Sequence, residues 1–279
     1  MVNSECNHNC RHCYISYKGH RSPKETVKLV DRLTTQGYKV TIAGAETLLN
    51  LDYLKAYKRA GQDYILTNGL LLLERPEIFD KLNEYDIKKI EVSLHFGIQK
   101  DLNSVPEEIV AKVIDESKKR DFEIQINTTI NQKNYRNVAY MCRGAYELEV
   151  DRIQFIRYVK SGKARENTPL RTVTEGEREL FFDLVDAVKE RYDKDDLYIK
   201  IHGNFGPKKG TEGEELSKCN TYCPAGKTFF AISPDNNVYG CPFLMEYPIG
   251  KLIRDGIDIE EELCSGKRDT CITDYLLGD

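Results

Sequence analysis

The chain lacks the features of a membrane protein or a nucleic-acid-binding protein. No apolar run approaches the roughly 18 residues of a membrane span, and the first residues, MVNSECNHNC, contain no apolar signal-peptide core. The formal net charge is only -4, and charges of both signs are mixed along the sequence rather than gathered into a basic run. We therefore expect a cytoplasmic protein that binds neither nucleic acid nor a membrane.

Cysteine, by contrast, is abundant. The 279 residues include nine cysteines, and in a reducing compartment such residues are more often metal ligands or catalytic groups than disulfides. Three lie at positions 6, 10 and 13, and five lie between 219 and 271. This distribution indicates two metal sites, one toward each end of the sequence. The isolated Cys142 is expected to be a small buried hydrophobic residue.

Short β-type runs alternate with amphipathic helical stretches after the first cysteines, a pattern typical of parallel βα units. The predicted strands are 38–43, 63–67, 89–94, 123–129 and 152–158. The predicted helices are 22–37 and 175–192, each opened by a capping box, and 51–60, 76–84, 106–120 and 135–147. A sixth strand would have to precede Cys6, where only MVNSE stands, so we expect it to be short, displaced or missing.

These elements predict an α/β fold with a partial (β/α)6 barrel of the TIM type over residues 1–202. A stretch rich in glycine and charge, 203–217, then marks a linker. Residues 203–279 are expected to form a small cysteine-bearing appendage.

The spacing Cys6-x3-Cys10-x2-Cys13 is the most informative motif. Three thiolates bind three irons of a cubane cluster and leave the fourth iron open to chelate a substrate, whereas an electron-transfer cluster is normally closed by a fourth cysteine. The alternative is a Cys3His zinc site completed by His8 or His12. On the residues alone, both interpretations stay open.

The string CNHNCRHC resembles the CxxxCxxC hallmark of the radical S-adenosylmethionine (AdoMet) superfamily, with His12 in the place of an aromatic residue. Further along, GAET at 44–47 is similar to the family's GGEP motif, LTNG at 66–69 to its TNG turn, and VSL at 92–94 to its fourth strand. The resemblance implies that the three cysteines hold a 4Fe-4S cluster. It further implies that AdoMet is split into a 5'-deoxyadenosyl radical, and that an electron donor such as flavodoxin or ferredoxin supplies the electron.

Each motif follows a predicted strand, and in a parallel barrel the carboxyl ends of the strands converge on one mouth. The residues expected to contact AdoMet or substrate there are His12 at the adenine, Gly44, Ala45 and Glu46 at the amine, Ser93, Asn127 and Thr128 at the ribose, base or carboxylate, and Arg157 at a carboxylate. The alternatives are a solvated loop carboxylate for Glu46, strand-end hydrogen bonding to backbone for Ser93 and Asn127, and a surface ion pair for Arg157.

The C-terminal cysteines surround a predicted hairpin, in which 229–232 pairs with 238–240 across the turn residues PDNN. This region resembles the shortened SPASM extension called a twitch domain, which implies an auxiliary 4Fe-4S cluster. The predicted ligands are Cys223, Cys241, Cys264 and Cys271, with structural zinc as the alternative. Cys219 is then spare, and we hypothesise that it donates a hydrogen atom to a substrate radical. In the alternative, Cys219 is itself a ligand and Cys223 or Cys264 is spare.

Twitch and SPASM extensions recur in members that modify peptides or oxidise small alcohols. The resemblance therefore favours a maturase that epimerises or cross-links a ribosomal peptide. The sequence contains no recognisable peptide-recognition module before the barrel, so a peptide would be held at the barrel mouth or by a partner. The alternatives are a dehydrogenase or epimerase of a small molecule and, from another class, a non-catalytic zinc or iron-sulfur binding protein.

Overall fold

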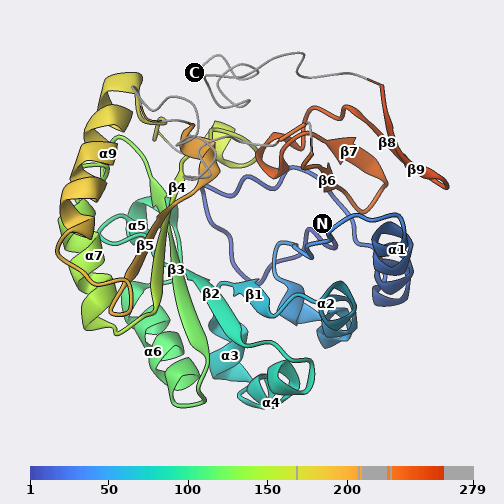
Figure 1. Ribbon diagram of the computed structural model, residues 1–279, viewed down its shortest axis with the longest axis horizontal. Coiled ribbons are helices and arrows are strands. Elements are labelled where there is room, and N and C mark those ends of the chain that lie inside the picture. The colour runs from blue at the N-terminus through green and yellow to red at the C-terminus, as the bar shows by residue number, and fades with distance from the viewer. Residues whose placement is uncertain (168, 207, 209–224, 227, 261–279) are drawn as a thin grey trace.

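The computed structural model describes residues 1–167, 169–206, 208, 225, 226 and 228–260. At its centre, five parallel strands form one sheet in the order β1-β2-β3-β4-β5. The strands are β1 (Tyr64–Thr67), β2 (Lys89–Ser93), β3 (Glu123–Ile130), β4 (Arg152–Arg157) and β5 (Tyr198–Ile201). Helices lie along the outer side of this curved sheet (Figure 1). The predicted α/β partial barrel is confirmed.

The helices follow the predicted pattern, with three short additions. Their bounds are α1 (Pro23–Thr35), α2 (Leu54–Ala60), α3 (Leu70–Glu74), α4 (Glu77–Glu84), α5 (Gln99–Leu102), α6 (Glu107–Lys118), α7 (Val138–Glu147), α8 (Ala164–Asn167) and α9 (Glu175–Lys189). Short 3-10 turns are η1 (Thr47–Leu49), η2 (Leu51–Tyr53), η3 (Gly203–Phe205) and η4 (Pro242–Leu244). Among the α-helices, those not predicted are α3, α5 and α8, each too short to show a helical period.

Both predicted capping boxes are present. The Ser22 side chain accepts from the backbone N–H of Glu25, whose carboxylate accepts from Ser22 in return. Thr174 and Glu177 make the same reciprocal pair at the start of α9. Each box satisfies two backbone donors, one of which the helix itself leaves free. Local sequence therefore sets where these two helices begin.

One predicted strand, 38–43, was wrong: this stretch forms no strand and joins the sheet by no backbone ladder. The Gln62 side chain satisfies the backbone of this stretch instead. Its Oε1 accepts from the Ile42 N–H (2.6 Å), and its Nε2 donates to the Ile42 carbonyl (3.2 Å). On its other side, the same stretch accepts a 2.8 Å hydrogen bond from the Val2 N–H at the Ala43 carbonyl. The residues before Cys6 thus contact this stretch but form no sixth strand of the sheet, and Asn3 makes only an isolated bridge with His20.

The last strand of the sheet was not predicted. β5 pairs in parallel with β4 in a register that places Tyr198 opposite Arg152. Its sequence, YIKI, has only four residues of alternating character, so the local signal is weak. β5 forms because the free edge of β4 provides backbone hydrogen-bond partners for it.

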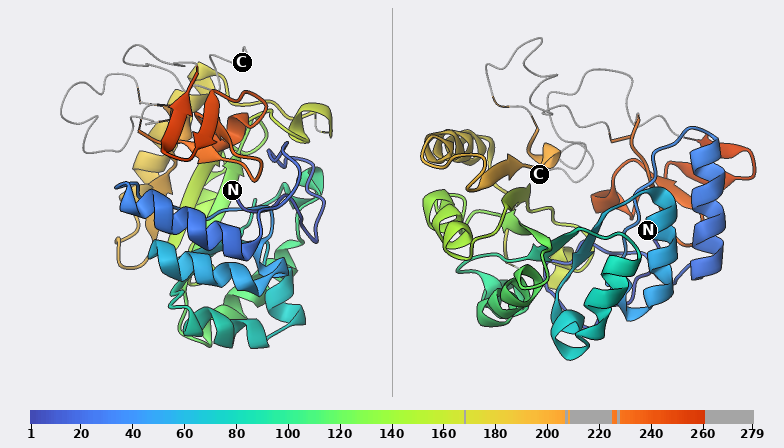
Figure 2. Two further views of the ribbon diagram at one scale, coloured as in Figure 1. Left: turned by 90° about the vertical axis from the view of Figure 1, so that its right-hand side faces the viewer. Right: turned by 60° about the horizontal axis from the view of Figure 1, so that its bottom comes forward.

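A second, antiparallel sheet follows, in the order β6-β7-β8-β9. Its strands are β6 (Ala231–Ile232), β7 (Asn237–Tyr239), β8 (Gly250–Ile253) and β9 (Gly256–Ile259). The predicted hairpin is thus present but shorter. Its turn places Asn236 at φ 69°, the left-handed region that asparagine tolerates. The sheet packs beside α1, where Val238, Ile249 and Leu252 contact Leu33 (Figures 1 and 2).

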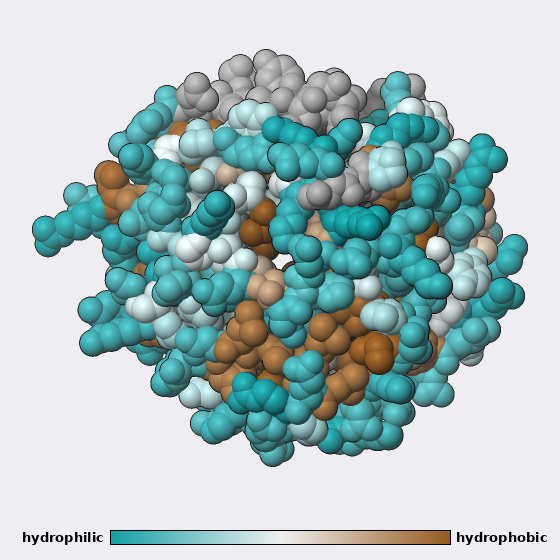
Figure 3. All heavy atoms as spheres, turned by 180° about the vertical axis from the view of Figure 1, so that it is seen from behind, coloured by the Kyte–Doolittle hydropathy of each residue, from teal (hydrophilic) through white to brown (hydrophobic). Residues whose placement is uncertain are grey.

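Among the described residues, no helix is long and apolar enough to cross a membrane. Seen from behind, polar side chains cover most of the surface, with one apolar area in its lower half (Figure 3). Cys142 lies fully buried in the main core, as predicted.

Candidate active site

The three N-terminal cysteines line one cavity of about 720 Å³, within the usual range for ligand sites. Leu66, Thr67 and Asn68 at the end of β1, and Ser93 at the end of β2, form another part of its wall. The chain folds this way because parallel strands present their carboxyl ends on one side of the sheet. The cysteine loop and the loops after the strands therefore face one space.

The electrostatics of the thiols suit a metal centre. Burial, and then the neighbouring thiols of Cys13 and Cys6, raise the pKa of Cys10 to about 12. Burial also raises the pKa of Cys6, opposed by hydrogen bonds from the His8 N–H (3.4 Å) and the Asn68 side chain (3.6 Å). A bound metal removes this obstacle because its charge keeps coordinating thiols deprotonated. The donor set fits an iron-sulfur cluster.

The zinc alternative would need His8 or His12 as a fourth ligand. Among the described residues, no three His, Cys, Asp or Glu side chains converge on one metal-ion position. His8 Nε2 lies 2.8 Å from the Asn103 carbonyl oxygen. His12 meets His95 edge to face with ring centroids 4.7 Å apart, and burial lowers its pKa to about 4. Both histidines are thus in contact with other groups of the protein.

Several residues that were not predicted as site residues form hydrogen bonds with the cysteine loop, through side chains or backbone. Asn103 donates to the Asn9 carbonyl (2.8 Å), and the Lys163 N–H donates to the Cys13 carbonyl (2.9 Å). Asn68 reaches both the Cys6 sulfur and the Asn7 side chain (2.8 Å). Only Asn68 had a signal in the sequence, since it stands in the TNG string. The others come from loops whose approach depends on the closed fold.

The predicted AdoMet-contacting residues divide into two sets. His12, Gly44, Ala45 and Ser93 line the cavity together with the cysteines. Glu46, Asn127, Thr128 and Arg157 are buried outside its lining.

The buried set is engaged with the protein. Asn127 accepts from Gln125 (2.9 Å) and Gln154 (3.2 Å) and donates to Glu91 (3.2 Å), which links three neighbouring strands. The Thr128 hydroxyl donates to the Leu94 carbonyl (2.6 Å). The Arg157 backbone exchanges two hydrogen bonds with the Asn204 side chain. Because Arg157 is only 4% exposed, it is not a surface residue. AdoMet contacts by these residues stay predictions.

Glu46 is not the solvated carboxylate of the alternative reading, because its exposed fraction is 0%. Its carboxylate accepts from the Thr67 hydroxyl and the Asn68 N–H (each 2.9 Å), and from the Leu48 N–H (3.2 Å). Burial raises the pKa of this carboxyl, and the three hydrogen bonds oppose the shift. The side chain therefore ties the GAET loop to the TNG loop behind the cavity wall.

Replacing Glu46 with glutamine is expected to lower the free energy of unfolding by about 1 to 3 kcal/mol, because an amide nitrogen cannot accept a hydrogen bond and leaves a buried donor unsatisfied. Urea unfolding of the metal-free protein measures this. Glu84→Gln, at an exposed pair with Lys81, is the control and should be nearly neutral.

Suppose instead that Glu46→Gln unfolds like the wild type but binds AdoMet roughly tenfold to a hundredfold more weakly, the loss expected of a charge-assisted hydrogen bond. The carboxylate would then be an AdoMet ligand rather than a tie between loops.

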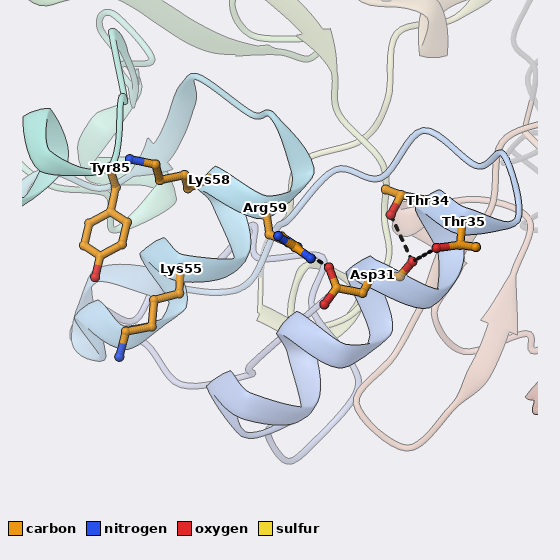
Figure 4. Close-up of a pocket in the computed structure, with 7 residues that line it drawn as sticks. All are labelled: Asp31, Thr34, Thr35, Lys55, Lys58, Arg59 and Tyr85. Carbon is orange, nitrogen blue, oxygen red and sulfur yellow. Dashed lines mark hydrogen bonds and ion pairs between the residues drawn. The ribbon is translucent and has the colours of Figure 1, made fainter.

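A second hollow lies between α1 and α2, on the outer side of the barrel (Figure 4). Its cations are exposed and paired: Arg59 with Asp31, Lys58 with Asp86 (3.0 Å) and Lys55 with Asp52 (2.7 Å). No cysteine lines it. It is a charged surface groove that takes no part in the candidate site.

Of the five C-terminal cysteines, only Cys241 is among the described residues. It is buried immediately before η4. Burial, and then Cys13 and Cys241, raise the pKa of the Tyr14 hydroxyl, so the phenol lies near both thiols. Tyr14 also meets Phe243 edge to face at 4.7 Å. The other four, Cys219, Cys223, Cys264 and Cys271, lie outside the described residues.

Comparison with known proteins agrees with this geometry. The Radical SAM superfamily matches residues 2–131. A curated relative, the AdoMet-dependent heme synthase of Methanosarcina barkeri, is 27% identical over 178 residues, which are 58% of this chain and 50% of that protein. The chain thus spans about half the length of this relative.

Solved structures share the fold. Streptococcus suis SuiB bound to the precursor peptide SuiA has a TM-score of 0.68 at 15% identity, over 94% of this chain and 62% of that chain. The structure of anSMEcpe with bound AdoMet has a TM-score of 0.61 at 19% identity, over 90% of this chain and 75% of that chain. Residues 2–131 therefore match the Radical SAM superfamily, whose cofactors are a 4Fe-4S cluster and AdoMet, and the partial barrel has the fold of these solved structures.

Proposed function

We propose that Cys6, Cys10 and Cys13 hold the 4Fe-4S cluster and that AdoMet binds beside it in the same cavity. The observation that carries this proposal is the shared lining, in which the three thiols face Gly44, Ala45 and Ser93. When bound, the cluster supplies the electron that splits AdoMet into methionine and a 5'-deoxyadenosyl radical, which removes hydrogen from a substrate carbon.

The chain's own groups prepare the site for a polar ligand. Within the described part of the chain, His12 Nδ1 is buried without a hydrogen-bond partner, a cost that a polar atom of AdoMet would remove. Glu46 holds the GAET loop so that its backbone faces the cavity. Asn68 steadies Cys6 from the TNG loop. The protein's part is to bind and orient the cofactors and to limit side reactions.

For the substrate, we propose a peptide, epimerised or cross-linked by the enzyme. Support comes from the shared fold: SuiB was solved with the precursor peptide SuiA, and anSMEcpe with the Cp18Cys peptide. The peptide would be held at the barrel mouth or by a partner, and a donor such as flavodoxin or ferredoxin would deliver the electron.

The second candidate is a dehydrogenase or epimerase of a small molecule. It is favoured by the curated relative, whose name describes the synthesis of heme rather than the modification of a peptide.

An auxiliary 4Fe-4S cluster in the C-terminal unit, residues 203–279, is part of the proposal. Its ligands would be Cys223, Cys241, Cys264 and Cys271, and Cys219 would serve as a hydrogen-atom donor. The burial of Cys241 close to Tyr14 is compatible with a metal ligand near the first cluster.

Anaerobic purification followed by iron analysis and a reduced AdoMet assay tests the proposal. We expect about eight irons per chain if both clusters are bound and about four if only one is, with formation of 5'-deoxyadenosine. Stoichiometric zinc without AdoMet cleavage would support the non-catalytic alternative. Mass spectrometry of short peptides encoded beside the gene, against small-molecule candidates, separates the two substrate classes.

A further inference from the structure

Besides the apolar contacts of Tyr14 and Tyr17 with the C-terminal unit, a carboxylate of that unit contacts the loop after β4, which lies against the cysteine loop. Glu246, in the turn after η4, accepts from the Gly162 N–H at Oε1 (2.9 Å) and pairs with Arg165 at Oε2 (2.6 Å). Arg165 also lies 3.3 Å from the Tyr247 hydroxyl. Glu246 therefore binds the loop after β4 through one ion pair, with Arg165, and one hydrogen bond, from Gly162.

That loop in turn rests on the backbone of the cysteine loop. Gly162 has φ 58°, and a Cβ built on it would lie 2.6 Å from the Tyr14 carbonyl and 2.8 Å from the Cys13 oxygen. The next residue, Lys163, donates its N–H to the Cys13 carbonyl (2.9 Å) and its Nζ to the Asn9 side chain (2.8 Å). The loop thus packs directly against the backbone of Cys13, the last cysteine of the triplet.

The position of Glu246 matters because it also borders the cavity. Glu246, Gly162 and Lys163 line the same space as the three cysteines, and only 23% of the Glu246 side chain is exposed. A carboxylate this shielded forms stronger hydrogen bonds than one in open solvent.

We infer that Glu246 is a positioning residue, through which the C-terminal unit sets the placement of the Cys13 backbone and hence of the AdoMet site. The inference rests on the proposed function, since it assumes that Cys13 is a cluster ligand. Glu246 acts on Cys13 through Gly162 and Lys163 and touches no reacting atom.

The first test uses hydrogen exchange in the metal-free protein. Glu246→Ala is expected to speed exchange in 161–165 and also in 9–17, whereas Glu246→Gln, which keeps an acceptor for the Gly162 N–H, should retain most of the protection. Glu84→Ala, which removes an exposed ion pair with Lys81 on α4, is the matched control and should leave both segments unchanged.

The second test uses the reconstituted enzyme. Glu246→Ala should keep the wild-type iron content but bind AdoMet about tenfold more weakly, and Glu246→Gln should stay within about fivefold of the wild type because the pair with Arg165 is partly exposed. Faster exchange confined to 161–165, with wild-type AdoMet affinity, would overturn the inference. If the wild type itself bound no iron and cleaved no AdoMet, the proposed function would fail instead, and the exchange data would still decide whether Glu246 holds the cysteine loop.

Discussion

Replacing Cys6, Cys10 and Cys13 together with alanine is expected to abolish 5'-deoxyadenosine formation and to remove about four irons per chain. The three thiols line one cavity, and the thiols of Cys13 and Cys6 add to burial in raising the pKa of Cys10, so we expect them to act as a unit that a bound metal centre stabilises. Any single replacement should have nearly the same effect on AdoMet cleavage, because two thiolates no longer present an open iron in a fixed geometry. Chromatographic quantification of 5'-deoxyadenosine under reducing conditions measures the loss.

The matched control is Cys142→Ala, since Cys142 is equally a thiol but lies in the core. This variant should retain iron and AdoMet cleavage, with a loss of unfolding free energy of about 1 kcal/mol from the small cavity it leaves. A triple variant that still produced 5'-deoxyadenosine would contradict the assignment of the cluster to these residues.

Replacing Gly162 with alanine is expected to lower AdoMet cleavage at least about tenfold and the free energy of unfolding by about 2 to 4 kcal/mol. Two costs combine. At φ 58° an L side chain is strained, and its Cβ would collide with the Tyr14 and Cys13 backbone, which cannot move aside as a flexible side chain would. The cysteine loop must shift to make room. Urea unfolding and the AdoMet assay measure the two effects separately.

Alanine at Gly97 is the control for backbone strain without a steric clash. Gly97 has φ 77°, but a Cβ built on it meets nothing within 4 Å. Gly97→Ala should therefore cost only about 1 kcal/mol and leave AdoMet cleavage unchanged. Equal behaviour of the two variants would show that the contact between Gly162 and the cysteine loop has no consequence for the site.

Much of the molecule was predictable because the signals involved are local. The capping boxes at Ser22 and Thr174 set the starts of α1 and α9 through hydrogen bonds within three residues. Alternation in short apolar runs located β1 to β4, and Asn236 supplied the left-handed turn of the small hairpin. The cysteine spacing predicted a cluster-binding loop because the intervals between Cys6, Cys10 and Cys13 match a known ligand motif.

Other features depend on which segments meet in space. β5 exists because β4 offers an edge, and the residues before Cys6 exchange backbone hydrogen bonds with the 43–46 stretch because the fold brings the two side by side. Whether Glu46 faces AdoMet or the TNG loop is a question of side-chain direction, which the GAET string does not contain.

The sequence alone thus determined the strand and helix segments, the cysteine triplet and the family resemblance, all of which rest on residues close together along the chain. Only the tertiary structure decided the neighbours of the cysteine loop: Asn68, Asn103, Gly162 and, through Gly162, Glu246. These contacts join residues that are 61 to 94 positions apart for the asparagines and 84 for Gly162 and Glu246. No local pattern encodes such pairs, because each hydrogen bond forms only after the barrel has brought the loops at its mouth together.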